Sequence, residues 1–157
     1  MKSYHINKGA GLSGLTVREH DIPVPGPREV LVRVRASSLN FRELMILILG
    51  YYPLPIRPDV VPVSEGAGEV VAIGSNVTRI KVGERVAGAV FPYWMDGPFE
   101  WDTAAQLGGS LDGMLTEYAV LPEEGVVHVS EHLSFEEAAA LPLVGVTAWN
   151  ALTGGRP

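Results

Sequence analysis

The sequence predicts a mainly β fold, a barrel or a sandwich of short strands with a few short helices. Three observations lead to this prediction. Short apolar stretches recur from residue 3 to about residue 129, Gly and Pro separate them, and only two regions show helical spacing. With 157 residues, 46% of them hydrophobic, the chain is long enough to bury a core of its own.

The clearest strand covers residues 30–36. Side chains alternate between the two faces of a strand, and here the faces differ in character. One face carries Val30, Val32, Val34 and Ala36, and the other carries Leu31, Arg33 and Arg35. We therefore expect this strand to be half buried, and we expect further strands over residues 70–73, 85–90 and 114–120, which are rich in apolar residues.

Two helical regions interrupt the strands. In the first, apolar residues recur at helical spacing and predict a short buried helix that ends at Gly50: Phe41, Leu44, Met45, Ile48 and Leu49. In the second, Ser134 and Glu137 form a capping-box pattern that opens a helix, and another helix is expected from Gly145 to Leu152.

A Gly-x-Gly-x-x-Gly pattern at residues 9–14 matches a dinucleotide-binding fingerprint in letters only. The fingerprint must open a helix inside a β-α-β unit, whereas the residues that follow here alternate as a strand and then reach prolines. We interpret the pattern as the flexible tip of a hairpin.

Charge and composition exclude several classes of protein. The formal net charge is −6 and the basic residues are scattered, which argues against a nucleic-acid partner. No secretory leader follows Met1, and no apolar run approaches the roughly 20 residues of a membrane span. We expect a soluble cytoplasmic protein with no membrane partner. His128 and His132 precede the helix start at Ser134, so they lack the helical spacing of a chelating pair.

The glycine-punctuated segment at residues 64–74 resembles the Gly-His-Glu signature of the medium-chain dehydrogenases/reductases, the family of alcohol dehydrogenases and quinone reductases. Val63 stands where the first Gly of that signature would be, and Ser64 stands where the zinc-ligating His would be. Zinc prefers thiolate and imidazole ligands, and the chain contains no cysteine. Of the usual catalytic zinc set only Glu65 is retained, so the resemblance implies the zinc-independent branch, with no metal site.

Three further stretches carry the same resemblance, at residues 36–44, 82–86 and 138–149. Asn40 occupies the position of a zinc-ligating Cys, and Leu143 that of another. The resemblance implies a GroES-like, partly open β-barrel as substrate-side domain over residues 1–130. Residues 131–157 would then form a helical crossover toward a nucleotide-binding Rossmann domain, which this sequence does not contain.

The function implied by the resemblance is that of the N-terminal part of an NAD(P)-dependent, zinc-independent oxidoreductase. It would transfer a hydride between NADP or NAD and a small carbonyl, quinone or alcohol, within a homodimeric parent protein. These 157 residues alone are expected to be inactive. The alternative is a non-catalytic binding or structural module built on the same barrel.

Five residues are candidates for the site. The Asn40 amide is suited to donating to a substrate oxygen or to the nicotinamide region, or the residue simply N-caps the helix that follows. The Tyr52 phenol precedes Pro53 as a tyrosine does in similar quinone reductases, but Tyr51 competes for this role. A second aromatic of those relatives aligns with Met45.

The resemblance assigns Thr147 to contact with the nicotinamide, although a helical Thr also bonds back to its own helix. Arg42 is a candidate for binding the cofactor or an acidic substrate, with an ion pair to Glu65 or Glu43 as the favoured alternative. Ser64 is either a hydrogen-bond donor or an inert small residue. The aromatic insertion within residues 91–113 is expected to cover the substrate cleft or to form a subunit contact.

Overall fold

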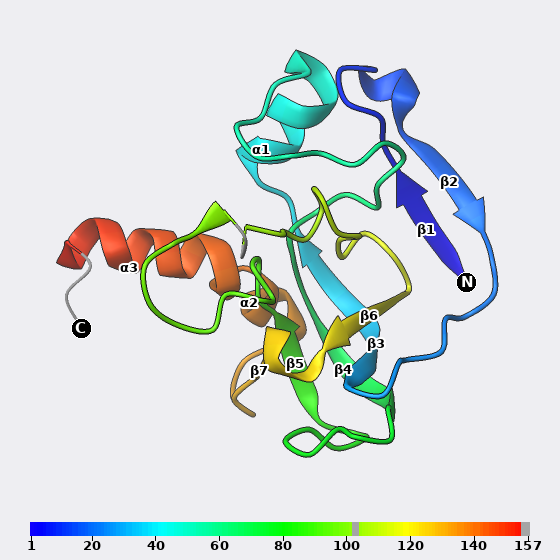
Figure 1. Ribbon diagram of the computed structural model, residues 1–157, viewed down its shortest axis with the longest axis vertical. Helices are drawn as coiled ribbons and strands as arrows, with labels where there is room; N and C mark the ends of the chain where they lie inside the picture. The colour runs from blue at the N-terminus through cyan, green and yellow to red at the C-terminus, as the bar shows by residue number, and fades with distance from the viewer. Residues whose placement is uncertain (102–103, 155–157) are drawn as a thin grey trace.

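A computed structural model describes residues 1–101 and 104–154 (Figure 1). Its centre is a five-stranded antiparallel sheet in the order β6-β3-β4-β5-β7, which curls into a partly open barrel. The strands are β3 (Glu29–Ser38), β4 (Glu65–Ile73), β5 (Arg85–Gly88), β6 (Tyr118–Pro122) and β7 (Val126–His128). A separate two-stranded sheet pairs β1 (Lys2–His5) with β2 (Thr16–Glu19). The predicted mainly β fold with short helices is confirmed.

Strand β3 is the spine of the sheet because it pairs with both β4 and β6. Its register against β4 shifts between Leu31 and Val32 and again between Val34 and Ala36. Such bulges bend a strand and increase its twist, which accounts for the curl of the sheet. They also disturb the expected alternation, because Leu31 is buried along with Val30 and Val32.

The predicted strand boundaries are right in the middle of the sheet and wrong at one edge. β4 contains the predicted residues 70–73 but begins at Glu65, and β5 ends at Gly88 rather than at residue 90. The strand expected over 114–120 covers Tyr118–Pro122 instead. Residues Met114 and Leu115 donate their N–H groups to the carbonyls of Val63 and Pro62, outside the sheet.

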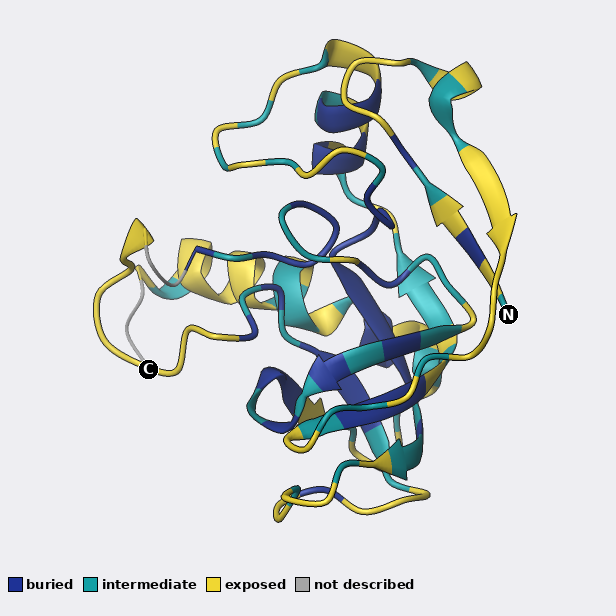
Figure 2. Cartoon of the chain, turned by 45° about the vertical axis from the view of Figure 1, so that its right-hand side comes forward, coloured by how far each residue is buried: buried dark blue, intermediate teal, exposed yellow. Residues whose placement is uncertain are grey.

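The main core lies against one face of the curled sheet, and Figure 2 shows the buried strands at the centre of the molecule. Its buried members are Val30, Val32, Val70, Ile80, Val86, Leu107, Met114, Ala119, Leu121 and Val126. On the other face, helix α2 (Phe135–Ala139) places Ala138 and Ala139 against Ala67 and Ala87. These small residues allow the helix to approach the sheet closely.

The capping box that opens α2 is confirmed. The Ser134 hydroxyl accepts from the Glu137 N–H at 3.1 Å, and the Glu137 carboxylate accepts from the Ser134 N–H at 2.8 Å. A π-helical turn, η5 (Leu141–Gly145), follows, and helix α3 (Val146–Thr153) confirms the last predicted helix. α3 buries none of its residues and extends away from the sheet (Figure 1).

The helix after Asn40 forms where predicted, but its predicted buried face is wrong. Helix α1 (Phe41–Leu44) continues as a π-helical turn, η2 (Met45–Leu49), which ends at a left-handed Gly50. The buried positions are Arg42, Glu43, Ile46 and Leu47, while four of the expected core residues are exposed: Phe41, Leu44, Ile48 and Leu49. The wider π turn departs from the 3.6-residue period on which the expectation rests. Polar partners also hold the two charged side chains inward: the distant Leu107 carbonyl accepts from Arg42, and the nearby Asn40 N–H donates to Glu43.

The glycine pattern at residues 9–14 lies at the tip of the β1–β2 hairpin, as expected. A three-residue 3₁₀ turn, η1 (Leu12–Gly14), leads directly into β2, so no helix of a β-α-β unit follows. His132 lies in a turn after β7 and before α2, so the two late histidines do not share a helix. No helix in the described part of the chain is long and apolar enough to cross a membrane.

The hairpin tip packs directly on the end of η2. A Cβ atom at Gly50 would meet the Cα of Gly9 at 3.1 Å, and both residues have positive φ angles, 63° and 70°. Gly50→Ala is expected to lower the free energy of unfolding by more than the roughly 1–2 kcal/mol of a left-handed Ala, because the neighbour must also move. Urea denaturation measures the loss.

Gly83→Ala is the matched control. Gly83 has a φ of 90° but no atom lies within 4 Å of its added Cβ, so it reports the backbone cost alone. Equal losses for the two variants would contradict the proposed packing of the hairpin on the helix end.

Candidate functional site

The centre of the candidate site is the buried carboxylate of Glu65, at the start of β4. Its Oε1 atom accepts two hydrogen bonds, from the Asn40 side-chain amide at 3.1 Å and from the Val144 N–H at 3.0 Å. Its Oε2 atom is buried and has no hydrogen-bond partner among the described residues. Glu65 therefore joins the start of α1, the start of β4 and η5 at a single oxygen.

Burial sets the protonation of this group. It raises the pKa of the Glu65 carboxyl, and the hydrogen bonds from Asn40 and Val144 act in the opposite direction. The backbone of Leu143 acts in the same direction as these donors, and the net shift of the pKa is still upward because burial disfavours the charged form more than the donors offset.

Asn40 is both the N-cap of α1 and a partner of Glu65. Its backbone N–H donates to the Glu43 carboxylate at 2.8 Å. Its side-chain nitrogen donates to Glu65 and lies 3.5 Å from the Ser38 carbonyl. Both amide hydrogens thus face protein acceptors, and the side-chain oxygen belongs to the capping box that opens α1, facing the Glu43 N–H.

Arg42 is buried, and its guanidinium contacts the segment that follows the aromatic insertion. It donates to the Leu107 carbonyl at 2.9 Å and to the Gln106 side-chain oxygen at 3.0 Å. It also lies 3.4 Å from the Glu43 carboxylate, so of the two expected ion-pair partners the structure selects Glu43. Burial raises the pKa of Glu43, and the charge of Arg42 opposes that rise.

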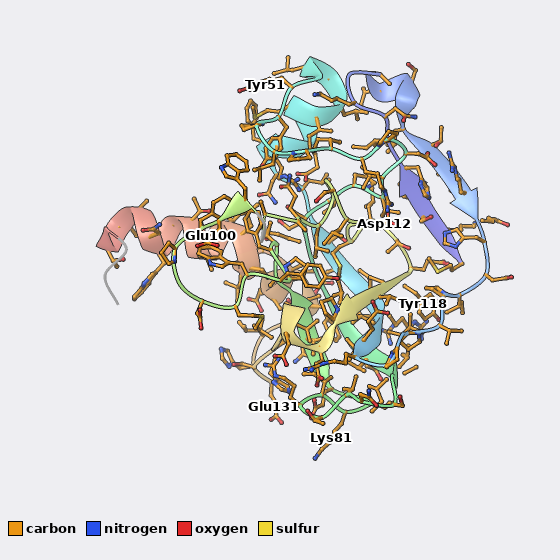
Figure 3. The ribbon with its side chains drawn as sticks, in the orientation of Figure 1. Tyr51, Lys81, Glu100, Asp112, Tyr118 and Glu131 are labelled. Carbon is orange, nitrogen blue, oxygen red and sulfur yellow. The ribbon has the colours of Figure 1, made fainter. Side chains whose placement is uncertain are left out.

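Tyr52 is held by the same guanidinium. The central carbon of the Arg42 guanidinium lies 4.9 Å from the centre of the Tyr52 ring, a cation–π arrangement. Ile6 and Ile46 belong to the apolar cluster on which the ring packs, and its hydroxyl makes no hydrogen bond with the residues that the structure describes. Tyr51 is exposed and lies at the periphery beside the helical turn (Figure 3).

Ser64 is fully buried, and its hydroxyl finds no partner in the described ranges. The residue before it, Val63, has a φ of 73°, a left-handed conformation that a β-branched side chain adopts only under strain. The Val63 carbonyl accepts from Met114 at 2.7 Å, and a Cβ at Gly113 would lie 2.1 Å from that oxygen. The surrounding chain therefore imposes this conformation at the position where the family signature has Gly.

Thr147 lies exposed in the first turn of α3, beside an apolar hollow of about 240 Å³. The hollow is also lined by Val90, Phe91, Trp94 and Leu143. The Thr147 hydroxyl makes no hydrogen bond within the described part of the chain. The contact of a helical Thr with the backbone of its own helix, which Thr153 makes, is therefore not observed at Thr147. The expected contact with a nicotinamide stays a prediction.

The aromatic insertion forms a cluster beside α3. Its rings meet edge to face, with centroids 5.6 Å apart for Phe91 and Phe99 and 5.8 Å apart for Trp94 and Phe99. Farther along the chain, Gln106 is buried, and its side-chain oxygen accepts a hydrogen bond from Arg42. Whether the insertion covers a substrate or contacts another subunit stays a prediction.

Gln106 is a buried site residue that the sequence did not indicate. Its side-chain nitrogen has no partner among the described residues, and a Cβ at Gly109 would lie 2.8 Å from that nitrogen. The one available signal is the Gly108-Gly109 pair, which marks a close approach of backbone to side chain. Nothing in the local pattern of the sequence identifies what is approached.

The donor chemistry at the family's zinc positions does not fit a tetrahedral zinc site. Asn40 offers an amide, Ser64 a hydroxyl and Leu143 a hydrocarbon, whereas such sites use thiolate, imidazole and carboxylate ligands. No group of three or more His, Cys, Asp or Glu suited to a metal ion occurs within residues 1–101 and 104–154.

Comparison with known proteins assigns the chain to a family. Residues 26–131 match the model of the alcohol dehydrogenase GroES-like domain. The chain therefore belongs to this family, and with it to the medium-chain dehydrogenases/reductases. The proposed resemblance and the GroES-like fold are confirmed.

Relatives include both alcohol dehydrogenase-like proteins and quinone oxidoreductases. The chain is 43% identical, over 94% of its length, to a zinc-type alcohol dehydrogenase-like protein of Schizosaccharomyces pombe, and it spans 43% of that protein. It is 43% identical, over 85% of its length, to a quinone oxidoreductase of Pseudomonas aeruginosa, of which it spans 34%. A solved NAD-dependent alcohol dehydrogenase superposes with a TM-score of 0.80 at 33% identity, covering 100% of this chain and 48% of that one.

The raised pKa of Glu65 generates a prediction about stability and pH. The folded state holds the Glu65 proton more firmly than the unfolded state does, so the free energy of unfolding falls as pH rises from the ordinary value of 4.5 through the raised folded value. Glu65→Gln removes this contribution. The difference in stability between wild type and variant should therefore move against wild type as pH rises, as measured by urea denaturation at several pH values.

Glu69→Gln, on the same strand but half exposed, is the matched control for loss of a carboxylate. The free energy of unfolding of wild type minus that of Glu65→Gln should change with pH more than the same difference for the control. A change no larger than the control's would contradict the buried carboxylate.

The strained Val63 generates a second prediction. Val63→Gly loses a buried side chain, which costs about 1.5–3 kcal/mol, but it relieves a left-handed conformation that costs about 1–3 kcal/mol. The free energy of unfolding of this variant is therefore expected to exceed that of Val86→Gly by about 1 kcal/mol or more. Val86→Gly removes an equally buried Val from β5 without any relief of backbone strain. Thermal unfolding of the two variants measures the difference, and equal losses would contradict the strain.

Proposed function

We propose that these residues form the substrate side of an NAD(P)-dependent, zinc-independent oxidoreductase acting on a small carbonyl, quinone or alcohol. The observation that carries the proposal is the Glu65 junction. By resemblance, these are the family's catalytic positions, and here they carry the Asn40 amide, the Ser64 hydroxyl and the Glu65 carboxylate in place of a zinc ligand set. Membership of the family and the names of the relatives support the oxidoreductase class.

The hollow beside Thr147 fits the nicotinamide end of such a cofactor. A nicotinamide is a flat ring with one carboxamide, and the hollow combines apolar and aromatic walls with the Thr147 hydroxyl, which has no hydrogen-bond partner among the described residues. When bound, the cofactor supplies the hydride chemistry, whereas the protein supplies binding, orientation and electrostatics. Thr147 would hold the carboxamide, and the Asn40 side chain would contact the same region of the cofactor.

Tyr52 is the donor that we assign to the substrate oxygen. A carbonyl that receives hydride develops negative charge on its oxygen, and a fixed O–H donor stabilises that charge. The Tyr52 hydroxyl is unpaired within the described residues, and its ring is clamped by Arg42 and an apolar cluster. Arg42 is then a positioning residue, because its guanidinium is already engaged by Gln106, Leu107 and Glu43.

The domain boundaries are part of the same proposal. Residues 1–130 form the substrate-side domain, and residues 131–157 lead toward a nucleotide-binding domain in a homodimeric parent protein. The exposed apolar side chains of α3 support a covering partner, since Val146, Trp149 and Leu152 are all more than half exposed. Small molecules are the expected partners, and the cytoplasm is the expected location.

Tyr52→Phe tests the proposal in a protein that joins this chain to its nucleotide-binding domain. Loss of a single fixed donor to a developing oxyanion lowers kcat by about 100-fold or more. The measurement is oxidation of NADPH with a benzoquinone acceptor, and KM should change little by comparison.

Tyr4→Phe, on β1 and away from the site, is the control and should leave kcat unchanged. A large loss with Tyr51→Phe and none with Tyr52→Phe would move the role to Tyr51. Absence of hydride transfer in the wild-type joined protein would favour a non-catalytic binding module.

A further inference from the structure

Three consecutive residues that follow the aromatic insertion each offer an oxygen to the Arg42 guanidinium. The Gln106 side-chain oxygen and the Leu107 carbonyl accept at 3.0 and 2.9 Å, and the Gly108 carbonyl lies 3.5 Å from Nη2. Arg42 and Gln106 are both buried, so these contacts are shielded from water. Residues 106–108 therefore form a cradle for the guanidinium, and Gln106 supplies its side-chain acceptor.

The orientation of the Gln106 amide follows from the chemistry of its partner. A guanidinium has N–H donors and no acceptor, so the Gln106 atom that faces Arg42 is the oxygen. A reversed amide would set two donors against each other at 3.0 Å. The Gln106 nitrogen, on the other branch of the amide, is buried without a hydrogen-bond partner among the described residues, so reversal would gain no contact there.

The backbone of the cradle is itself fixed. The Leu107 N–H donates to the Val90 carbonyl at 2.9 Å, which closes the base of the aromatic insertion. The Gln106 carbonyl accepts from the Leu111 N–H at 2.9 Å, and the Gln106 N–H donates to the Ser110 hydroxyl at 3.0 Å. The Gln106 side chain therefore extends from a held backbone and transmits its position to Arg42.

Arg42 carries this position on to Tyr52. The central carbon of the guanidinium lies 4.9 Å from the centre of the Tyr52 ring. The other support of the ring is an apolar cluster, and apolar contacts restrain a side chain without directing it. The orientation of the ring therefore depends on where the guanidinium is held.

We propose that Gln106 is a positioning residue for Tyr52 and acts through Arg42. The inference rests on the proposed function, in which the Tyr52 hydroxyl donates to the substrate oxygen. Without the Gln106 oxygen, Nη2 of Arg42 keeps only the long contact to the Gly108 carbonyl among the cradle oxygens. The guanidinium can then turn about its bond to the Leu107 carbonyl, and the Tyr52 ring loses its directional support.

Proton NMR of the Arg42 guanidinium tests the positioning in the 157-residue chain, without substrate or cofactor. Hydrogens over the face of an aromatic ring are shifted upfield by its ring current. We expect the Arg42 guanidinium hydrogens upfield of those of Arg33, which is exposed. Tyr52→Leu should remove this difference, which assigns it to the Tyr52 ring.

Gln106→Leu should lose most of the upfield shift, whereas Gln106→Glu keeps an acceptor oxygen on a side chain of the same length and should retain it. Val126→Ala, in the core on β7, is the control for a general loss of packing and should also retain it. An unchanged shift in Gln106→Leu would overturn the proposal. If that variant does not fold, Gln106→Asn, whose acceptor is withdrawn by one methylene, should show the same loss and decides in its place.

The effect on the reaction is measured in the protein joined to its nucleotide-binding domain. Gln106→Leu should lower kcat about 10- to 100-fold with little change in KM, because the substrate still binds while its donor is misplaced. Gln106→Glu should restore kcat, and an unchanged kcat in Gln106→Leu would overturn the proposal. If the wild-type joined protein transfers no hydride, the proposed function fails, and the NMR shifts still decide whether Gln106 positions Tyr52.

Discussion

The arrangement of the candidate site depends on one buried carboxylate. Glu65 accepts from Asn40, 25 residues before it, and from Val144, 79 residues after it, at the same oxygen. Removing a charge from water is costly unless donors compensate for it, so these two contacts fix α1 and η5 relative to β4. The second oxygen of Glu65 has no hydrogen-bond partner among the described residues, and unsatisfied buried polar atoms of this kind occur at functional sites.

The same constraint explains the inverted face of α1. Once Asn40 is bound to Glu65, its backbone N–H orients Glu43, and Glu43 pairs with Arg42. Arg42 in turn reaches Gln106 and Leu107, so a continuous polar network runs from β4 to the end of the aromatic insertion. Charged residues therefore hold the inner positions of the helix, and its apolar residues face outward.

Features of the fold that depend on neighbouring residues were predictable from the sequence, whereas features that depend on partners far along the chain were not. The cap at Ser134 and the stop at Gly50 depend on neighbouring residues, so both were predictable from sequence. The buried face of α1 was not, because the partners of Arg42 lie 64 to 66 residues away. Gln106 was missed for the same reason. The candidate residues came from resemblance, and the structure adds the partners of Asn40 and the contact of the Tyr52 ring with Arg42.

The central claim is that the Glu65 carboxylate holds η5 against the sheet, and the exchange rate of the Val144 amide tests it most directly. The Val144 residue is exposed, so an amide without this bond would exchange about as fast as one at a helix end. The account predicts that hydrogen exchange at Val144 is as slow as at Ala67 in the core of β4. Rapid exchange at Val144 beside a protected Ala67 would contradict it.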